Sequence, residues 1–310
     1  MIATHTFNPS VDITYSIEPI KVGDVNRVKD MIKNPGGKGI NVTKVLHILG
    51  ADYCAYGYLG GSHGEWMKEA LERQNIKTAF TSIQDETRQS LAINDGVSQT
   101  EVLEQGPTIL KQEQESYLET AKSHISEITV ATISGSSPHL DETTKYAHMK
   151  RILELYTESY NIVDTNAKEL KELLEQQLPV HCIKPNQSEF ETLIDEKNLS
   201  IEECVKMLKS HPFFRNIDVF LTLGGDGAVI KWKDEVYRAT IPRKEIVNPV
   251  GSGDSTVAGI AYGVHEKLNP ESMIRLALAC GTSNALQTQT GHIDMKQVET
   301  IKKEVEVERL

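Results

Sequence analysis

Short apolar runs alternate with amphipathic, charge-rich segments along most of this chain. The apolar runs are expected to be strands, and they lie at 2–7, 53–59, 128–133, 161–164, 181–184 and 218–223. Segments with helical spacing include 64–75, 112–126, 142–158 and 166–177, and late helices are expected at 252–267, 270–287 and 294–304. Because buried strands that alternate with helices form parallel sheets covered on both faces, the sequence predicts an α/β fold with a Rossmann-like three-layer αβα core.

Two segments interrupt this alternation. Residues 11–33 and 86–105 have the pattern of short alternating strands, and Asn94-Asp95-Gly96 is typical of a hairpin turn. The prediction is a core of residues 1–10, 34–85 and 106–310, with 11–33 and 86–105 forming a small β-sheet lid. Since a small sheet without helical cover is marginally stable alone, we expect the lid to pack against a second copy in a homodimer.

Composition and charge restrict the partners and the compartment. A formal charge of −11 over 310 residues argues against nucleic acid, although a few local cations can still hold a small phosphorylated ligand. No apolar run approaches the roughly 20 residues that span a bilayer, and residues 1–10 lack the pattern of a secretion signal. The cysteines are widely separated, so free thiols in a reducing cytoplasm are expected rather than a zinc site, at Cys54, Cys182, Cys204 and Cys280.

Residues 248–259 contain the motif that indicates chemistry. Gly251-Ser252-Gly253 precedes a helix-compatible apolar run, and a glycine turn at a helix start directs backbone N–H groups toward an anion such as phosphate. Asp254 follows at once, where a carboxylate would repel a phosphate. This placement is reasonable if Asp254 accepts a proton from a hydroxyl that attacks the phosphate. The alternative is an aspartate that caps an ordinary helix.

Two further glycine or amide motifs lie near lysines. Residues 34–43 surround Lys38 with three glycines, in a spacing that differs from a Walker A loop, and a helix-entry turn is the alternative. Residues 184–189 place Asn186 and Glu189 on one face of a helix start. These two side chains could organise water around Mg²⁺, or they could form a capping box.

Other candidates lie at strand ends and at the boundary between core and lid. Residues 220–228 give a strand that ends in a glycine-rich turn, which suits either a nucleotide site or a tight hairpin. Asp12 and Arg88 fall at expected core–lid junctions, and each could equally be a surface charge. Gly60–Gly64 matches the G-x-S-x-G pattern around Ser62, so a serine hydrolase is an alternative, although no glycine-rich oxyanion loop precedes it.

Together these motifs resemble the ribokinase-like (PfkB) family of carbohydrate kinases over nearly the whole chain. The matching segments occur in the family's order: NPSVD, GGKGINV, Thr87-Arg88, ISGSSP, KPNQSE, LTLGGDGA and NPVGSGDSTVAG. His5 and Phe7 stand where the family pattern predicts smaller or aliphatic residues. The resemblance implies a ribokinase-like core, a β-lid, and ATP-dependent phosphorylation of a ketose phosphate to its bisphosphate. A catalytically idle binding relative is the alternative.

The resemblance also implies roles for individual residues. Asp254 would be the base, with Gly251, Ser252 and Gly253 as the anion hole. The sugar phosphate would contact Asp12, Arg27, Gly37, Lys38, Asn41, Arg88 and Ser136. ATP would contact Lys184, Asn186, Thr222, Gly224, Gly227, Ser283 and Asn284. Mg²⁺ would be held by Glu189, through water, and by Asn186.

Overall fold

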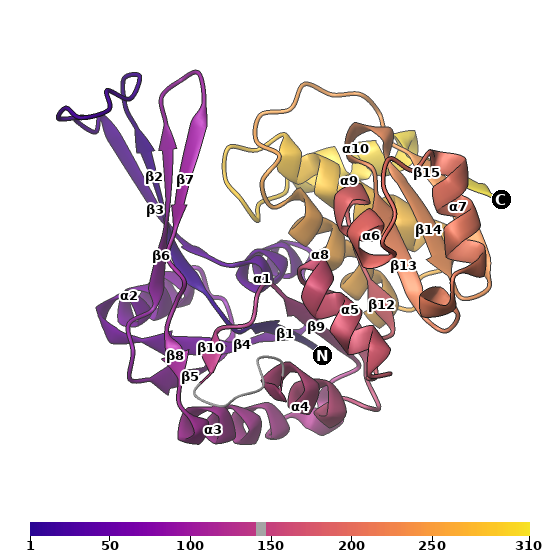
Figure 1. The fold of residues 1–310 in the computed structure, drawn as a ribbon, viewed down its shortest axis with the longest axis horizontal. Coiled ribbons are helices and arrows are strands. Elements are labelled where there is room, and N and C mark those ends of the chain that lie inside the picture. Colours follow the sequence, from indigo (N-terminus) through magenta and orange to yellow (C-terminus); the bar gives the residue numbers. More distant parts are fainter. Residues whose placement is uncertain (141–146) are drawn as a thin grey trace.

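A ten-stranded sheet forms the centre of the molecule in the computed structural model, which describes residues 1–140 and 147–310 (Figure 1). The strand order is β16-β15-β14-β13-β12-β11-β9-β1-β4-β5. The strands are β1 Ile2–Thr6, β4 Tyr53–Gly60, β5 Thr78–Ile83, β9 Val130–Ser134, β11 Tyr160–Asp164, β12 Cys182–Ile183, β13 Asp218–Thr222, β14 Ala228–Trp232, β15 Glu235–Thr240 and β16 Glu306–Arg309. Part of the expected helix at 142–158 lies outside the described residues.

The sheet is parallel from β5 to β13 and antiparallel from β13 to β16. All six strands expected from the sequence belong to the parallel part. They alternate with helices, and each is buried over most of its length, which is the pattern that parallel sheets require. The prediction of a mostly parallel α/β fold is confirmed.

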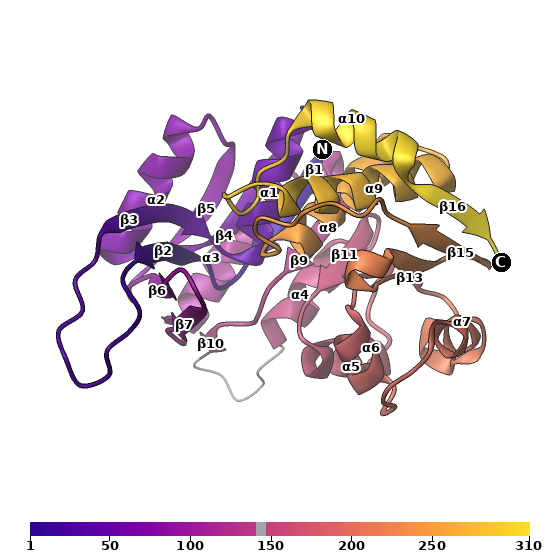
Figure 2. The same cartoon turned by 90° about the horizontal axis from the view of Figure 1, so that it is seen from above.

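Helices cover both faces of this sheet, and Figure 2 shows α1, α9 and α10 on one side and α5, α6 and α7 on the other. The first apolar layer is formed with α1 Lys38–Ile48, α2 Gly61–Arg73, α8 Ser252–His265, α9 Pro270–Ala285 and α10 Met295–Glu304. The second is formed with α3 Lys111–Lys122, α4 Ala147–Leu155, α5 Ala167–Glu175, α6 Gln187–Leu193 and α7 Ile201–Ser210. Ile2 packs into the first layer and Ala3 into the second, as the two-residue period of a strand requires.

A smaller sheet projects from one end of the core (Figure 1). Its order is β3-β2-β6-β7, and the strands are β2 Ser10–Ser16, β3 Asp30–Gly36, β6 Arg88–Asn94 and β7 Gln99–Leu103. The two segments expected to form a lid supply most of these residues, and they meet through the parallel pair β2–β6. Apolar side chains on this sheet are more than half exposed at Met31, Ile32, Val102 and Leu103. A separate two-stranded pair joins β8 Thr108–Ile109 and β10 His139–Leu140.

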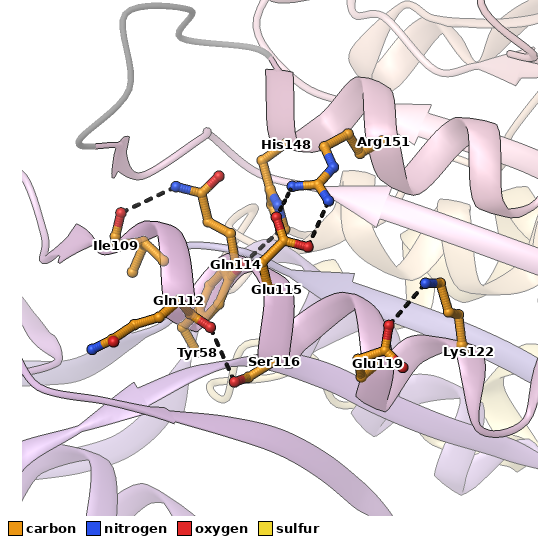
Figure 3. A network of polar contacts seen from close by, with 10 residues as sticks. All are labelled: Tyr58, Ile109, Gln112, Gln114, Glu115, Ser116, Glu119, Lys122, His148 and Arg151. Carbon is orange, nitrogen blue, oxygen red and sulfur yellow. Dashed lines mark hydrogen bonds and ion pairs between the residues drawn. The ribbon is translucent and has the colours of Figure 1, made fainter.

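The unexpected aromatic residues at the end of β1 lie in a buried polar cluster under the sheet. His5 Nδ1 lies 2.6 Å from the Tyr117 hydroxyl, and Phe7 packs edge-on against His148. Burial lowers the pKa of both His5 and His148 to about 3, so both rings are neutral. The Tyr58 hydroxyl lies 2.7 Å from His148 Nε2, which fixes the start of α4 against the sheet (Figure 3).

Candidate functional site

Polar side chains gather at the carboxyl ends of the parallel strands, where ligands of open α/β sheets bind. Asp164 is the last residue of β11, Lys184 directly follows β12, and Thr222 ends β13. A Cβ on Gly253 would lie 3.1 Å from Lys184 Nζ, so the start of α8 faces the same edge. The topology thus brings the glycine turn to residues that are distant in the sequence.

The turn before α8 has the geometry that an anion cradle needs. Gly251 is the N-cap with φ of +82°, and a Cβ there would meet Thr290 Cγ2 at 2.5 Å, so this position requires glycine. Ser252 Oγ is buried and has no hydrogen-bond partner among residues 1–140 and 147–310. The free N–H groups at the start of a 14-residue helix therefore lie next to an unpaired hydroxyl, and this arrangement suits a phosphoryl group.

Asp254 lies in the first turn of α8 and is only 6% exposed. Asn41 of α1 donates a hydrogen bond from Nδ2 to Asp254 Oδ2 at 2.8 Å, which fixes the carboxylate. Burial and the negative charge of Asp164 raise the pKa of Asp254 to about 6, against the opposing effects of Asn41, Lys38 and Lys184. A carboxyl group with this pKa is mostly ionised at neutral pH and is well matched to accept a proton.

Asp164 is a central member of the site that sequence reasoning missed. It is 2% exposed, and Lys38 Nζ and Lys184 Nζ each lie 3.6 Å from one of its oxygens. Neither oxygen has a hydrogen-bond partner within the described part of the chain. Asp164 is also the main cause that raises the pKa of Lys38, so this lysine stays charged. The sequence feature that could have indicated Asp164 is its position as a carboxylate at the end of a buried strand, Asn161-Ile162-Val163-Asp164.

The magnesium ion expected from the sequence was assigned to Asn186 and Glu189. Asn186 and Glu189 form a reciprocal capping box at α6, with Asn186 N donating to Glu189 Oε2 at 2.9 Å and Glu189 N donating to Asn186 Oδ1 at 2.8 Å. Over residues 1–140 and 147–310 no group of three acidic, histidine or cysteine side chains is suitable for a metal. Mg²⁺ keeps most of its waters and needs only one or two carboxylates. Asp164 could supply one, although each of its oxygens already lies 3.6 Å from a lysine, and the charges of both Asp164 and Glu189 raise the pKa of Lys38 between them.

On the side of the smaller sheet, Asp12 of β2 approaches the glycine-rich loop. A Cβ on Gly36 would overlap the Asp12 carboxylate, and Ser10 Oγ donates to Asp12 Oδ1 at 2.6 Å. Burial raises the pKa of Asp12. Arg88 of β6 is opposite Ser10 in the sheet and donates from Nε to the Asn8 carbonyl at 3.2 Å. Asp12 and Arg88 therefore lie on adjacent strands, close to the core.

The remaining predicted residues have different surroundings. Arg27 lies in the exposed loop between β2 and β3, and Ser136 is exposed after β9. Gly224 and Gly227 lie in the connection of the antiparallel pair β13–β14, so a hairpin accounts for them. Asn284 is fully buried and donates to the Val250 carbonyl at 2.8 Å, so it supports the cradle from behind. Ser283 is also fully buried and bonds to Gln297 Oε1 at 3.1 Å.

The geometry around Ser62 differs from that of a hydrolase. Ser62 Oγ donates to the Glu86 carboxylate at 3.3 Å. Both ring nitrogens of His63 have other partners, since Nδ1 lies 2.9 Å from the Thr87 carbonyl and Nε2 lies 2.9 Å from Gln89 Nε2. The histidine beside the serine is therefore engaged elsewhere, and within residues 1–140 and 147–310 Ser62 bonds to no histidine that could act as its base.

Phosphoryl transfer requires mainly correct positioning of the reactants and neutralisation of their negative charge. A glycine cradle, two lysines and a buried carboxylate at this sheet edge could supply both. The chain belongs to the pfkB family of carbohydrate kinases, whose family model matches residues 5–297. The resemblance found in the sequence motifs is thereby confirmed.

Individual relatives extend this result. The chain is 40% identical over 312 aligned residues to a tagatose-6-phosphate kinase of Staphylococcus epidermidis, with 99% of both chains covered. A solved structure from Staphylococcus aureus with a proposed phosphofructokinase activity is 31% identical, with a TM-score of 0.84 and coverage of 100% of this chain and 99% of that one. Phosphofructokinase-2 of Escherichia coli shares the fold, with a TM-score of 0.86 at 23% identity over 97% and 98% of the two chains.

Proposed function

We propose that this kinase transfers the γ-phosphoryl group of ATP to a ketohexose phosphate, giving the bisphosphate. The preferred substrate is D-tagatose 6-phosphate and the product D-tagatose 1,6-bisphosphate, in lactose and galactose catabolism. The observation that supports this most is the Asp254 carboxylate, which Asn41 holds beside the Gly251–Gly253 turn. The choice of sugar rests on the full-length similarity to the tagatose-6-phosphate kinase of Staphylococcus epidermidis.

In the proposed mechanism Asp254 accepts the proton of the attacking sugar hydroxyl. Its raised pKa keeps it basic enough for this task, while its burial excludes competing water. The N–H groups at the start of α8, together with Lys38 and Lys184, stabilise the negative charge on the transferred group. Mg²⁺, when bound with ATP near Asp164 and Glu189, would neutralise phosphate charge.

The nucleotide and sugar would approach from opposite sides of the cradle. Asp12, Gly37, Lys38, Asn41 and Arg88 are assigned to the sugar phosphate, because Asp12 and Arg88 lie on the smaller sheet beside the glycine-rich loop. Exposed apolar side chains next to the cradle offer a surface for an adenine ring, at Ile246, Val247 and Val250. Sequence reasoning had not selected these three positions.

The smaller sheet is proposed to act as a lid over the sugar site and as the contact surface of a homodimer. Its exposed apolar residues, such as Met31 and Leu103, support association, because a thin sheet with exposed apolar side chains is marginal alone. Arg27 would contribute its charge from the exposed loop of the lid. The four cysteines are free, which supports a cytoplasmic location, and no described helix is long and apolar enough to span a membrane.

Steady-state kinetics with ATP and three sugars test this proposal. Tagatose 6-phosphate should give the highest kcat/KM, with fructose 1-phosphate and fructose 6-phosphate as the competitors, and ADP release as the readout. A preference for fructose 1-phosphate would replace the sugar assignment by a 1-phosphofructokinase. Binding without ADP release from any of the three would indicate the alternative, a catalytically idle sugar- or nucleotide-binding relative.

A further inference from the structure

Lys44 is a buried cation at the junction between helix α1 and the smaller sheet. It is 9% exposed, and its Nζ donates to the Pro35 carbonyl at 2.5 Å. Pro35 belongs to β3 and pairs with Val11 of β2, close to where both strands enter the core. This hydrogen bond therefore joins a core helix to the base of the lid.

The charge of Lys44 interacts electrostatically with the carboxylates of Asp12 and Asp254. Asp12 and Asp254 both favour its charged form, while burial lowers its pKa to about 8, so it remains mostly protonated at pH 7. Arg88 and Glu101 act on Asp12 from the lid, and Lys38, Asp164 and Lys184 act on Asp254 from the core. Burying an ammonium group is unfavourable unless charges and acceptors compensate it, and a methionine of similar length would pack without that penalty.

The contacts of Lys44 continue in both directions. Toward the lid, Pro35 is followed by Gly36, whose Cα packs directly against the Asp12 carboxylate. Toward the core, Asn41 lies on the same helix, three residues before Lys44, and donates to Asp254 at 2.8 Å. One turn of α1 thus contacts the base of the lid and the catalytic carboxylate.

We propose that Lys44 is a positioning residue, which fixes the strand ends of the lid at Pro35 relative to Asp254. A sugar held by the lid then places its attacking hydroxyl next to the Asp254 carboxylate. This inference rests on the proposed function, because it takes Asp12 as a sugar contact and Asp254 as the base. Lys44 acts through the Pro35 carbonyl and through the field between the two carboxylates.

The test compares K44M, which removes the charge and the donor, with K44R, which keeps both. The matched control is K231M, because Lys231 is 7% exposed and also donates to backbone carbonyls, those of Ile217 and Lys233. It lies at the other end of the sheet, opposite Val219 at the start of β13. Thermal unfolding should show a comparable change of stability in K44M and K231M, because both variants replace a buried ammonium group by an apolar side chain of similar length.

Kinetics then separate positioning from folding. In K44M, the KM for the sugar phosphate should rise roughly tenfold and kcat should fall roughly tenfold, with the KM for ATP within about twofold, because positioning errors reduce both sugar binding and the chemical step. K44R should recover most of both losses, and K231M should keep both constants. Wild-type constants in K44M, equal kinetic losses in K231M, or no recovery in K44R would each overturn the proposal.

A second readout needs no substrate. Hydrogen exchange of the backbone should increase in K44M both in the segment that contains Pro35 and Gly36 and in the segment that contains Gly251 to Asp254. K231M should change neither. If the wild-type protein phosphorylates no ketose phosphate, the proposed function fails, yet this measurement still decides whether Lys44 connects the two segments. Unchanged exchange in K44M at both segments would refute the connection.

Discussion

The raised pKa of Asp254 gives a quantitative prediction for the pH dependence of activity. With a pKa of about 6, roughly nine-tenths of the carboxyl groups are ionised at pH 7 and roughly one-tenth at pH 5. Only the ionised form can accept the sugar proton, so activity is present above pH 6 and is lost as the pH falls through it. The kcat/KM for the sugar phosphate should therefore fall about tenfold from pH 7 to pH 5.

The D254N variant tests whether Asp254, and no other titrating group, causes the loss of activity at low pH. Loss of the base should reduce turnover by about 10²–10⁴-fold, or roughly 3–5 kcal/mol of barrier, and should remove the acidic limb of the profile. While turnover falls, the stability of D254N toward unfolding should rise above that of the wild type at pH 7. The folded state binds the Asp254 proton more tightly than the unfolded chain does, so the ionised carboxylate lowers stability at pH 7 by about 3 kcal/mol.

Below pH 6 that penalty diminishes, and it disappears below the unfolded pKa of 3.8. D254N should thus unfold at higher temperature than the wild type at pH 7, since the new amide can still accept the hydrogen bond from Asn41. The assays are coupled ADP release from pH 5 to 8 and thermal unfolding. The control is D218N, which changes a buried aspartate (8% exposed) at the start of β13 and should keep turnover. Near-normal turnover in D254N, or an unchanged acidic limb, would refute the reasoning.

Three further substitutions test other parts of the site. D164N should raise the Mg²⁺ concentration for half-maximal activity roughly tenfold and shift the acidic limb to lower pH, because Asp164 raises the pKa of Asp254. An unchanged Mg²⁺ titration would contradict that role. R88A should mainly raise the KM for the sugar phosphate, and unchanged saturation would refute the assignment. M31E places a charge on the exposed lid surface and should dissociate the proposed homodimer, so light scattering should give a dimer mass for the wild type and a monomer mass for the variant. A mass that stays dimeric would exclude this surface.

Most of the core could be predicted because its strands are strongly patterned. Apolar runs such as Tyr53–Gly60 and Val130–Ser134 are buried and bounded by turn residues, so their period and composition agree. The antiparallel end of the sheet was less visible. β16 is the edge strand and three of its four residues are exposed, so it lacks an apolar signal, while β15 combines its buried residues with Glu235 and Arg238. Only the fold shows that β16 pairs with β15.

The site was predictable where a residue type is required by backbone geometry or by a motif. Gly251 has a positive φ and Asn186 caps a helix. Both requirements come from the local backbone, so the neighbouring sequence reveals them. Asp164 and Lys44 were missed because their roles depend on neighbours that are remote in the sequence. Asp164 meets Lys38 and Lys184 only when β11 lies beside β9 and β12, and Lys44 approaches Asp12 only when α1 packs beneath the lid.

The interior position of β1 has a consequence for synthesis of the chain. Its two neighbours in the sheet, β4 and β9, are separated from it by unequal lengths of polypeptide, and Val130 follows Thr6 by 124 residues. At ~5–20 residues per second, a ribosome needs about 6–25 seconds to make that stretch. Until β4 is made, both edges of β1 lack a partner, and until β9 is made, one edge stays open to pairing with another molecule.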